Sequence, residues 1–316
     1  MKVLCYLLKK LAISLTTLFF VVTLTFVLMK SIPGDPFLQE QAIPEEIMKS
    51  LHAHYGLDQP IYIQYGKYIN GILTWDLGPS FKYEGRTIND IIQDGFPISF
   101  SLGLFALTLA LIWGIFWGSV AAFYRGKWQD RFGTVIAVLG MSVPSFIMAT
   151  FLQYIFGIKL GILPIARWGG LSHMILPAIA IASFPSAFIA RLIKTSMVEV
   201  LEKDYIITAR SKGLTTFEIW RGHVFKNSIL PLTAYLGSLT ANIFTGSFVV
   251  EKIFGIPGIG SWFVNSITNR DYTIIMGLTI FYSSILMFTI FVSDLLSVLL
   301  DPRIKNDMLE ANGRSS

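Results

Sequence analysis

Six long apolar runs divide the sequence, and they limit what the chain can fold into more than any other feature. A run of about 20 apolar residues forms a helix long enough to cross the ~30 Å hydrocarbon layer of a bilayer. Charged residues make up only 14% of the chain, whereas about a quarter is usual for a soluble domain. The sequence therefore predicts an all-α integral membrane protein with six transmembrane helices. The predicted spans are Leu11–Met29, Phe100–Phe123, Phe132–Ile158, Met174–Ala190, Ile229–Val250 and Ile274–Leu300.

The distribution of basic residues predicts how these spans are oriented. Lys2, Lys9 and Lys10 precede the first run, and seven Lys or Arg residues lie between Arg191 and Lys226. Lys and Arg near the ends of spans are enriched on the cytoplasmic side. We therefore expect both termini in the cytoplasm (N-in and C-in). The first run is followed by no small-residue cleavage site, so it is interpreted as a retained span.

The spans and their connections define four regions. Residues 1–30 form an N-terminal cytoplasmic tip and the first span, 31–98 an extracytoplasmic loop, 95–300 the transmembrane core, and 301–316 a cytoplasmic tail. In the loop, one interfacial helix is expected through residues 45–55 and another after Pro60. The second carries aromatic residues at helical spacing, which either anchor it at the bilayer interface or cap the mouth of the bundle. Pro144 and Pro185 are expected to kink their spans.

A basic segment at about residues 191–228 separates the fourth span from the fifth. Its charges exclude it from the bilayer, so it must lie in the cytoplasm. Gly213 supplies a residue that can end a helix in the left-handed conformation. Thr215 and Glu218 then match a capping box that starts a second helix. The pattern predicts a helix, a glycine turn and a second helix.

The residues alone leave three interpretations of this helix–turn–helix. It is a DNA-binding unit, a basic pair of helices resting on anionic headgroups, or a docking knob for another protein. A segment attached to the bilayer at both ends cannot easily reach a DNA groove. In the third interpretation Leu214, Phe217 and Trp220 would fill a groove of the partner.

Short motifs in this segment resemble a known family. "TARSKG" (Thr208 to Gly213) followed by "HVFKNSILP" (His223 to Pro231) is similar to the EAA coupling segment of permease subunits in ABC importers of peptides. Ser211 stands where that family usually has alanine. The likeness extends over nearly the full length and is greatest to the B subunits of oligopeptide permeases. It rests also on "YGLDQPIYIQY" (55–65), "DLGPSFKYEGRTINDII" (76–92), "TGSFVVEKIFGIPGIGSWFVN" (245–265), "NRDY" (269–272) and "DLLSVLLDPRIK" (294–305).

The resemblance implies a type I ABC importer permease fold in the bacterial inner membrane. The chain would pair with a second homologous permease and form half of a peptide pathway. Two cytoplasmic ATPases would dock on the coupling segments, and an extracytoplasmic binding protein would deliver the peptide. ATP and Mg²⁺ would be bound by the partner subunits and no cofactor or nucleic acid by this chain, whose sequence has no G-x-x-x-x-G-K-[ST] loop. The expected ATPase-coupling residues are Tyr205, Thr208, Ala209, Arg210, Lys212, Gly213, Leu214, Phe217 and Trp220.

A second glycine-rich turn follows the fifth apolar run. Gly255, Pro257, Gly258 and Gly260 form it. It is either a re-entrant segment beside an outer gate or a plain extracytoplasmic loop.

Two other functions stay open. Dipeptide, glutathione and nickel permeases share much of the scaffold, so their substrates are alternatives to oligopeptides. An intramembrane enzyme would need a nucleophile, an acid–base pair or metal ligands at membrane depth. The sequence has no H-E-x-x-H or G-x-S-x-G motif, so no catalytic residue and no metal ligand is expected. Asp294, the one charge inside a predicted span, is expected to be structural.

Overall fold

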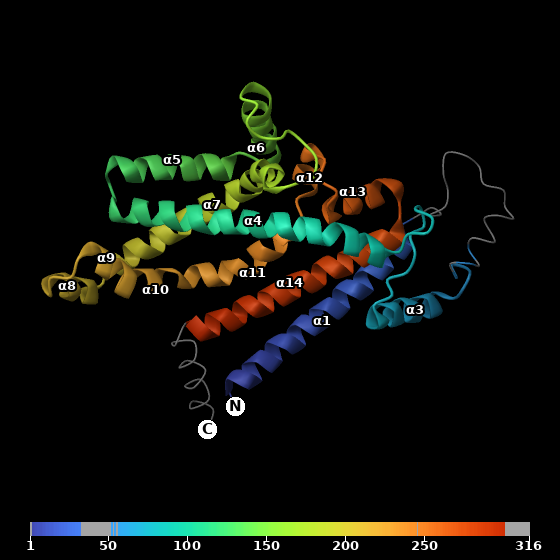
Figure 1. Ribbon diagram of the computed structural model, residues 1–316. Helices are drawn as coiled ribbons and strands as arrows, with labels where there is room; N and C mark the ends of the chain where they lie inside the picture. The colour runs from blue at the N-terminus through green and yellow to red at the C-terminus, as the bar shows by residue number, and fades with distance from the viewer. Residues whose placement is uncertain (1, 33–51, 53, 55, 245, 301–316) are drawn as a thin grey trace.

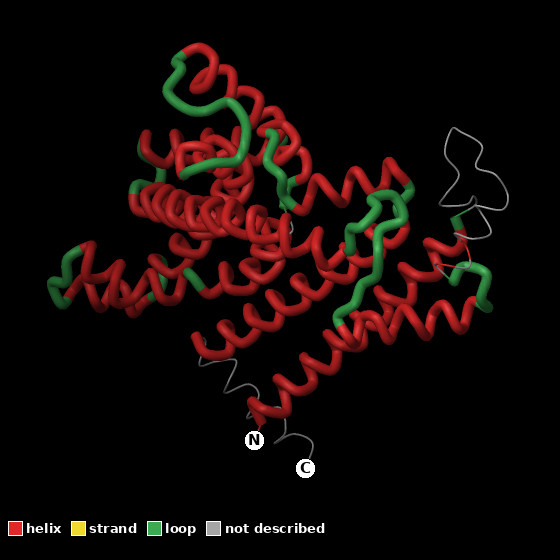
Figure 2. Tube along the Cα trace, turned by 45° about the vertical axis from the view of Figure 1, so that its right-hand side comes forward, coloured by secondary structure: helices red, strands yellow, loops and turns green. Residues whose placement is uncertain are grey.

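The computed structural model describes residues 2–32, 52, 54, 56–244 and 246–300 as a bundle of helices joined by loops (Figures 1 and 2). No strand occurs in these ranges. The helices are α1 (Lys2–Ser31), α3 (Ile61–Thr74), α4 (Ile88–Phe123), α5 (Trp128–Ser142), α6 (Ser145–Leu152), the π-helical η1 (Gln153–Lys159), α7 (Leu171–Leu201), α8 (Asp204–Ser211), α9 (Thr216–Ile219), the π-helical η2 (Trp220–Val224), α10 (Phe225–Ser228), α11 (Leu230–Phe244), α12 (Phe248–Phe254), α13 (Ile259–Asn269) and α14 (Tyr272–Leu300).

Four helices of the described residues are long and apolar enough to cross a bilayer. These spans are Cys5–Ser31 of α1, all of α4, all of α7 and Tyr272–Leu299 of α14. A fifth span is formed if α5 and α6–η1 count together, although the chain bends by 105° between them. Five of the six predicted spans therefore have a counterpart. The expected cytoplasmic tail and the helix expected at residues 45–55 lie outside the described residues, apart from His52 and His54.

Pro144 and Pro185, both expected to kink a span, have different effects. Pro144 precedes α6 as its N-cap residue and stands at the 105° break. Proline has no N–H to donate to the preceding turn, so the helical ladder stops there. Pro185 lies inside α7, which runs without interruption from Leu171 to Leu201.

The prediction of one continuous span over Ile229–Val250 is wrong. α11 has 15 residues, which makes it about 22 Å long. The chain leaves the helical path after Phe244 and starts again as α12 at Phe248. Gly246 takes a φ of +84° at this break, a conformation that a helix interior does not contain. Figure 1 shows α10 and α11 end to end, with α12 on a separate axis.

The core of the bundle is the contact between α4 and α7. A Cβ atom on Gly114 would lie 2.6 Å from Cβ of Ile189, and one on Gly118 would lie 2.6 Å from the carbonyl oxygen of Ala190. These two glycines let the helix axes approach each other closely. Because α7 leads directly into α8, this contact fixes the position of the basic segment relative to α4.

α1 and α14 pack side by side at the edge of the bundle, and α3 crosses the outer end of α1 (Figure 1). The Nζ atom of Lys10 lies 3.0 Å from Oδ2 of Asp294, so an ion pair joins α1 to α14. On α3, the Tyr65 ring packs edge-on against Phe26, while Tyr62 is exposed. One face of α3 therefore covers α1, and the other is free to contact the interface.

Candidate functional site

The first candidate region is the basic hairpin, defined here as residues 202–228. α8 ends at a turn in which Gly213 has a φ of +81°, as the sequence predicted. The backbone N–H of Thr215 donates to Oε2 of Glu218 at 2.7 Å, and the N–H of Glu218 donates to Oγ1 of Thr215 at 3.3 Å. This is the predicted capping box, and it starts α9. The turn is thus held by bonds between residues three apart in the sequence.

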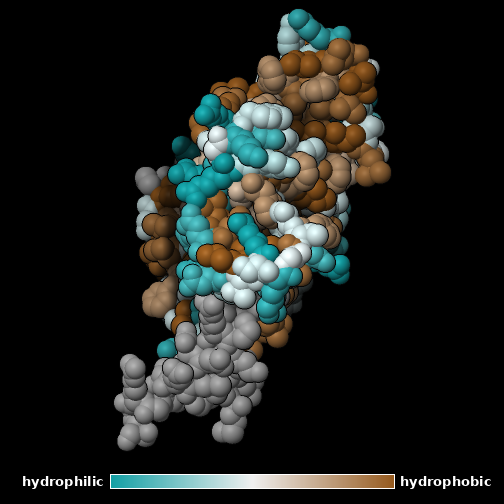
Figure 3. Space-filling model, turned by 90° about the vertical axis from the view of Figure 1, so that its left-hand side faces the viewer, coloured by the Kyte–Doolittle hydropathy of each residue, from teal (hydrophilic) through white to brown (hydrophobic). Residues whose placement is uncertain are grey.

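The hairpin presents three large hydrophobic side chains to its surroundings, those of Tyr205, Ile207 and Phe217. Phe217 is the most exposed of them at 64%, and Arg210 and Lys212 of the same hairpin are also exposed. Leu214 and Trp220, by contrast, are half-buried and pack against the chain's own core. In Figure 3, which faces this end of the molecule, hydrophilic residues gather at mid-height and hydrophobic residues above them.

The other expected coupling residues divide between the two sides of α8. Tyr205 and Thr208 are exposed, whereas Ala209 is buried beside Ile206. An apolar groove of about 900 Å³ separates the hairpin from the last turns of α4. Ile115 and Phe123 line it from α4, and Phe217 and Trp220 line it from the hairpin.

The second candidate region is the outer hairpin, defined here as α12, α13 and the turn between them (residues 248–269). It lies at the opposite end of α4 from the basic hairpin (Figure 1). Gly255 ends α12 with a φ of +61°. The four expected gate residues again divide, because Gly255 and Pro257 are exposed while Gly258 and Gly260 are buried.

Gly258 and Gly260 are buried against Glu251, a carboxyl group that the sequence reading missed. Glu251 is 0% exposed. A Cβ atom on Gly258 would lie 2.5 Å from Cδ of Glu251, one on Gly260 would lie 3.0 Å from its Oε2, and one on Gly246 would meet its Oε1. Three glycines therefore surround the carboxyl group, and none can be replaced without moving it.

Within the described residues, the hydrogen-bond donors to the Glu251 carboxyl group are neutral. Oγ of Ser99 donates to Oε1 at 2.7 Å, and the backbone N–H of Ser261 donates to Oε2 at 3.3 Å. No basic residue of the described chain forms an ion pair with it. α12 lies outside the helices of spanning length. Burial raises the pKa of Glu251 above its ordinary value, while the hydrogen bonds act in the opposite direction.

Asp271 forms a second buried carboxylate centre on the outer side. It is 0% exposed and accepts from Oγ of Ser80, from the N–H of Lys82 at 3.2 Å and from Oγ1 of Thr273 at 2.8 Å. It also accepts at 3.2 Å from the N–H of Ile274 in the first turn of α14. Asp271 therefore joins two motifs that lie almost 200 residues apart, "DLGPSFKYEGRTINDII" and "NRDY".

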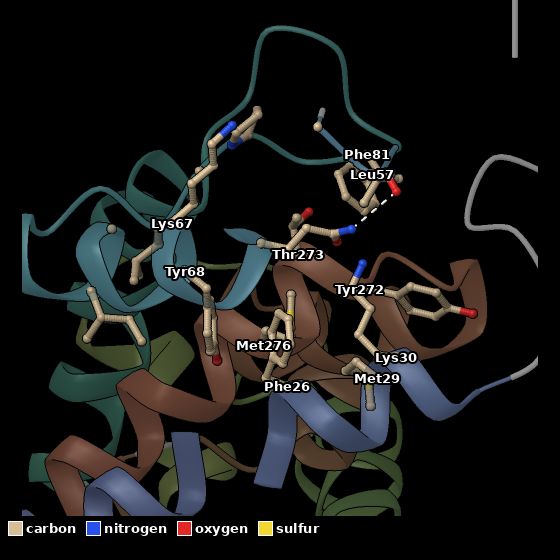
Figure 4. A pocket seen from close by; sticks show the side chains of 18 of the residues that line it. Phe26, Met29, Lys30, Leu57, Lys67, Tyr68, Phe81, Tyr272, Thr273 and Met276 are labelled. Atoms are coloured by element: carbon tan, nitrogen blue, oxygen red, sulfur yellow. Dashed lines mark hydrogen bonds between the residues drawn. The ribbon is translucent and has the colours of Figure 1, made fainter. Parts of the chain in front are cut away.

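A cavity of about 480 Å³ opens between α1, α3 and α14 (Figure 4). Phe26 and Met276 line its apolar part. The ammonium groups of Lys30 and Lys67 point toward its open side. Within the described part of the chain, the buried hydroxyl of Tyr68 has no hydrogen-bond partner.

Sequence features pointed to these buried acids, but only indirectly. Glu251 directly follows an apolar run and precedes two glycines spaced two apart, and Asp271 directly precedes the last apolar run. Each pattern indicates that the carboxylate lies close to the backbone of its own segment. Neither pattern predicts which residue of another helix binds the carboxylate. No three of His, Cys, Asp and Glu are grouped for metal binding in the residues that the structure describes.

Two family models match this chain. The model described as "Binding-protein-dependent transport system inner membrane component" matches residues 114–306. The model of the N-terminal part of such membrane components matches residues 3–103.

Curated relatives match over most of their own lengths. The dipeptide transport system permease protein of Bacillus subtilis is 48% identical over 300 residues, which is 95% of this chain and 97% of the relative. The oligopeptide transport system permease proteins of Haemophilus influenzae and Escherichia coli are each 39% identical over 302 residues, which is 95% of this chain and 99% of each relative.

A solved structure supports the same fold. An inward-facing crystal form of the MetNI methionine ABC transporter matches with a TM-score of 0.53 and 14% identity, covering 68% of this chain and 96% of the other. Together with the family models and relatives, these matches confirm the expected all-α membrane permease fold. The chain belongs to the family of inner membrane components of binding-protein-dependent transport systems.

Proposed function

We propose that this chain is one permease subunit of an ATP-driven peptide importer and that it forms half of the translocation pathway. The observation that carries the proposal is the basic hairpin, which exposes Phe217, Arg210 and Lys212 around a turn held by local hydrogen bonds. An exposed aromatic side chain with a basic rim is the form of a protein-docking surface. The dipeptide and oligopeptide permease relatives support the choice of peptides.

The proposed assembly has three kinds of protein partner. A second homologous permease completes the pathway, and two cytoplasmic ATPases bind the coupling hairpins of the two permeases. An extracytoplasmic binding protein delivers peptide on the side of the outer hairpin. In this arrangement both termini and the basic hairpin lie in the cytoplasm, and the chain is an inner membrane protein with several spans.

The hairpin would transmit motion in both directions. Only two residues separate α8 from α7, so a displacement of α8 would be passed directly to α7. α7 is in close contact with α4 through Gly114 and Gly118. Closure of the ATPases on bound ATP would therefore move α8, α7 and α4 together, and this motion would reach the outer side of the bundle.

The length of the peptide is the finer part of the proposal. The identity of 48% to a dipeptide permease, against 39% to two oligopeptide permeases, favours short peptides. The sequence motifs resemble those of oligopeptide permeases first, with dipeptide, glutathione or nickel permeases as alternatives. The experiment below compares these substrates directly.

The test is purification of the complex in mild detergent, followed by ATPase assays with a dipeptide, a hexapeptide, glutathione or Ni²⁺. A second permease and ATPases with phosphate-binding loops are expected to co-purify, and a peptide to stimulate ATP turnover. Phe217→Asp should lower the amount of bound ATPase at least about tenfold, as loss of an interface hot spot does. The matched control Phe217→Leu keeps an apolar side chain and should retain most of the ATPase.

Two results would contradict the proposal. One is an equal yield of ATPase with Phe217→Asp and with the unchanged chain, which would remove the docking role. The other is ATP turnover that Ni²⁺ stimulates and no peptide does. This result would make the chain a permease subunit of a nickel importer.

A further inference from the structure

We propose that Glu251 is a positioning residue that latches the outer hairpin to α4, and that this latch makes ATP turnover depend on delivered cargo. The inference deepens the proposed function and rests on it. Its basis is geometric: a single buried carboxyl group joins a short hairpin to a long helix that reaches the ATPase side of the molecule.

The carboxyl group of Glu251 joins α12 to α4. Glu251 belongs to α12, and its partner Ser99 belongs to α4, 152 positions earlier in the sequence. Ser99 is 1% exposed. Its Oγ donates to Glu251 and also accepts from the N–H of Ile259, at 2.9 Å, in the first turn of α13. One serine of a spanning helix therefore holds both arms of the outer hairpin.

Neighbouring contacts converge on the same turn. A Cβ atom on Gly95, one turn before Ser99, would lie 3.1 Å from the backbone nitrogen of Ile259. From the other side, the hydroxyl of Tyr282 on α14 donates to the carbonyl oxygen of Ile259 at 3.2 Å. The turn is thus clamped between α4 and α14, with Glu251 at the centre of its hydrogen bonds.

The contact between Glu251 and Ser99 is strong only while hydrogen bonds replace the water that the carboxyl group has lost. A carboxylate can accept on both oxygens, as Glu251 does from Ser99 and Ser261. Taking a carboxylate out of water without a cation is costly unless hydrogen bonds replace the water. A shift of α4 by about one hydrogen-bond length would break the bond from Ser99 and leave the carboxyl group under-coordinated. The latch therefore has a closed arrangement and an opened one that admits water.

The path from the latch to the ATPase side runs along α4. α4 is a single helix from Ile88 to Phe123. Its Ser99 lies in the latch, and its Ile115 and Phe123 line the groove beside Phe217 and Trp220. A movement of the basic hairpin against this groove acts on the same helix that holds the outer hairpin. When the latch is intact, α4 is held in the resting position until the binding protein loosens the outer hairpin.

The experiment compares Glu251→Gln and Ser99→Ala with the control Glu84→Gln, an exposed carboxylate of the outer loop. Glutamine keeps the shape of the Glu251 side chain but replaces one accepting oxygen with an NH₂ group. This group can only donate, so it cannot accept the hydrogen bond from the N–H of Ser261. The complex is reconstituted with its partners, and ATP turnover is measured with and without the binding protein and peptide. Hydrogen exchange of the segment 255–263 is measured in parallel.

The expected result has two parts. Exchange of segment 255–263 should be about tenfold faster in both latch variants than in the control, as loss of a hydrogen bond to a charged group implies. The ratio of stimulated to basal ATP turnover should fall at least about threefold, because basal turnover rises while the partner subunits still co-purify. The double variant should be no worse than the stronger single one, since both residues act through the same contact.

Three results would overturn the inference. Unchanged exchange in Glu251→Gln and Ser99→Ala overturns the latch and leaves the proposed function standing. Faster exchange with an unchanged ratio overturns its role in coupling. A complex of the unchanged chain that no peptide stimulates overturns the proposed function and the coupling role together. If Glu251→Gln does not assemble, Ser99→Ala decides by the same two measurements.

Discussion

The basic hairpin and the outer hairpin are built in opposite ways, although both are pairs of short helices at the ends of α4. The turn of the basic hairpin is held by bonds between residues three apart, those of Thr215 and Glu218, and the hairpin leaves Phe217 exposed. Its ion pair to the rest of the bundle, between Glu202 and Arg125, joins two exposed side chains. The outer hairpin is held by Ser99, a residue 152 positions away, through a carboxyl group with no exposed surface.

This difference indicates how each hairpin responds when the neighbouring helices move. A unit with its own local bonds keeps its shape when its surroundings shift, which suits a part that is pushed as a rigid body. A unit whose bonds reach other helices changes its environment whenever those helices move, which suits a part that responds to their position. The predictions below test this contrast from the largest expected effect to the smallest.

Asp271→Ala should be the most damaging change to the outer side. It leaves the hydroxyl of Ser80 and the backbone N–H of Ile274 without their acceptor. Buried donors without a partner cost about 1–3 kcal/mol each before relaxation, so we expect a loss of about 4 kcal/mol of stability. Thermal melting of the permease in detergent measures it. Asp271→Asn keeps one accepting oxygen and should lose about half as much; an unchanged melting temperature in Asp271→Ala would break the contrast.

Gly213→Val should separate ATP hydrolysis from transport. A β-branched residue at a φ of +81° is strained by about 2 kcal/mol, so the turn of the basic hairpin must rearrange. The spans make no use of this turn and should stay intact. Peptide uptake and ATPase activity of the reconstituted complex are the measurements. Unchanged uptake would contradict the prediction, and Gly222→Val, at a glycine with a negative φ, is the control.

Thr215→Ala should loosen the basic hairpin without affecting the rest of the bundle. It removes the oxygen that accepts from the N–H of Glu218. Loss of one N-cap corresponds to about fivefold faster hydrogen exchange in the first turn of α9. Thr215→Ser keeps the acceptor and is the control. Faster exchange that spreads to the outer hairpin would show that the cytoplasmic side is less self-contained than its bonds imply.

Lys10→Ala should have the smallest effect, although it removes a long-range contact. The ion pair of Lys10 with Asp294 joins α1 to α14, but both side chains are partly exposed. Such pairs contribute about 0.5 kcal/mol or less. The melting temperature in detergent should change by no more than that of Lys9→Ala. A loss as large as that of Asp271→Ala would mean that distant contacts control both ends of the molecule.

The features that the sequence predicted correctly are those decided by neighbouring residues. The left-handed Gly213 and the capping box of Thr215 and Glu218 depend on residues within one turn, and the structure confirms both. The apolar runs of α1, α4, α7 and α14 depend on composition over about 20 residues, and they form spanning helices.

The features that the sequence did not predict depend on residues far apart. The fifth run looks continuous up to Val250 because its composition is apolar throughout. At its break, a Cβ atom on Gly246 would meet the carboxyl group of Glu251, which is bonded to Ser99 on α4. Hydrophobicity likewise gave no sign that Pro144 would bend the third run by 105° rather than kink it slightly.

The length of α4 has a consequence for the lipid around the protein. Its 36 residues make a rod of about 54 Å, whereas the hydrocarbon layer is ~30 Å thick and helices rarely tilt by more than about 40°. Part of the rod must stand outside the oily layer, and its polar beginning at Asn89 and Asp90 is the natural part to do so. A thinner or thicker bilayer would change the tilt angle of α4. Because α4 connects the outer hairpin to the groove beside the basic hairpin, the thickness of the membrane would then affect how the two ends of the protein are coupled.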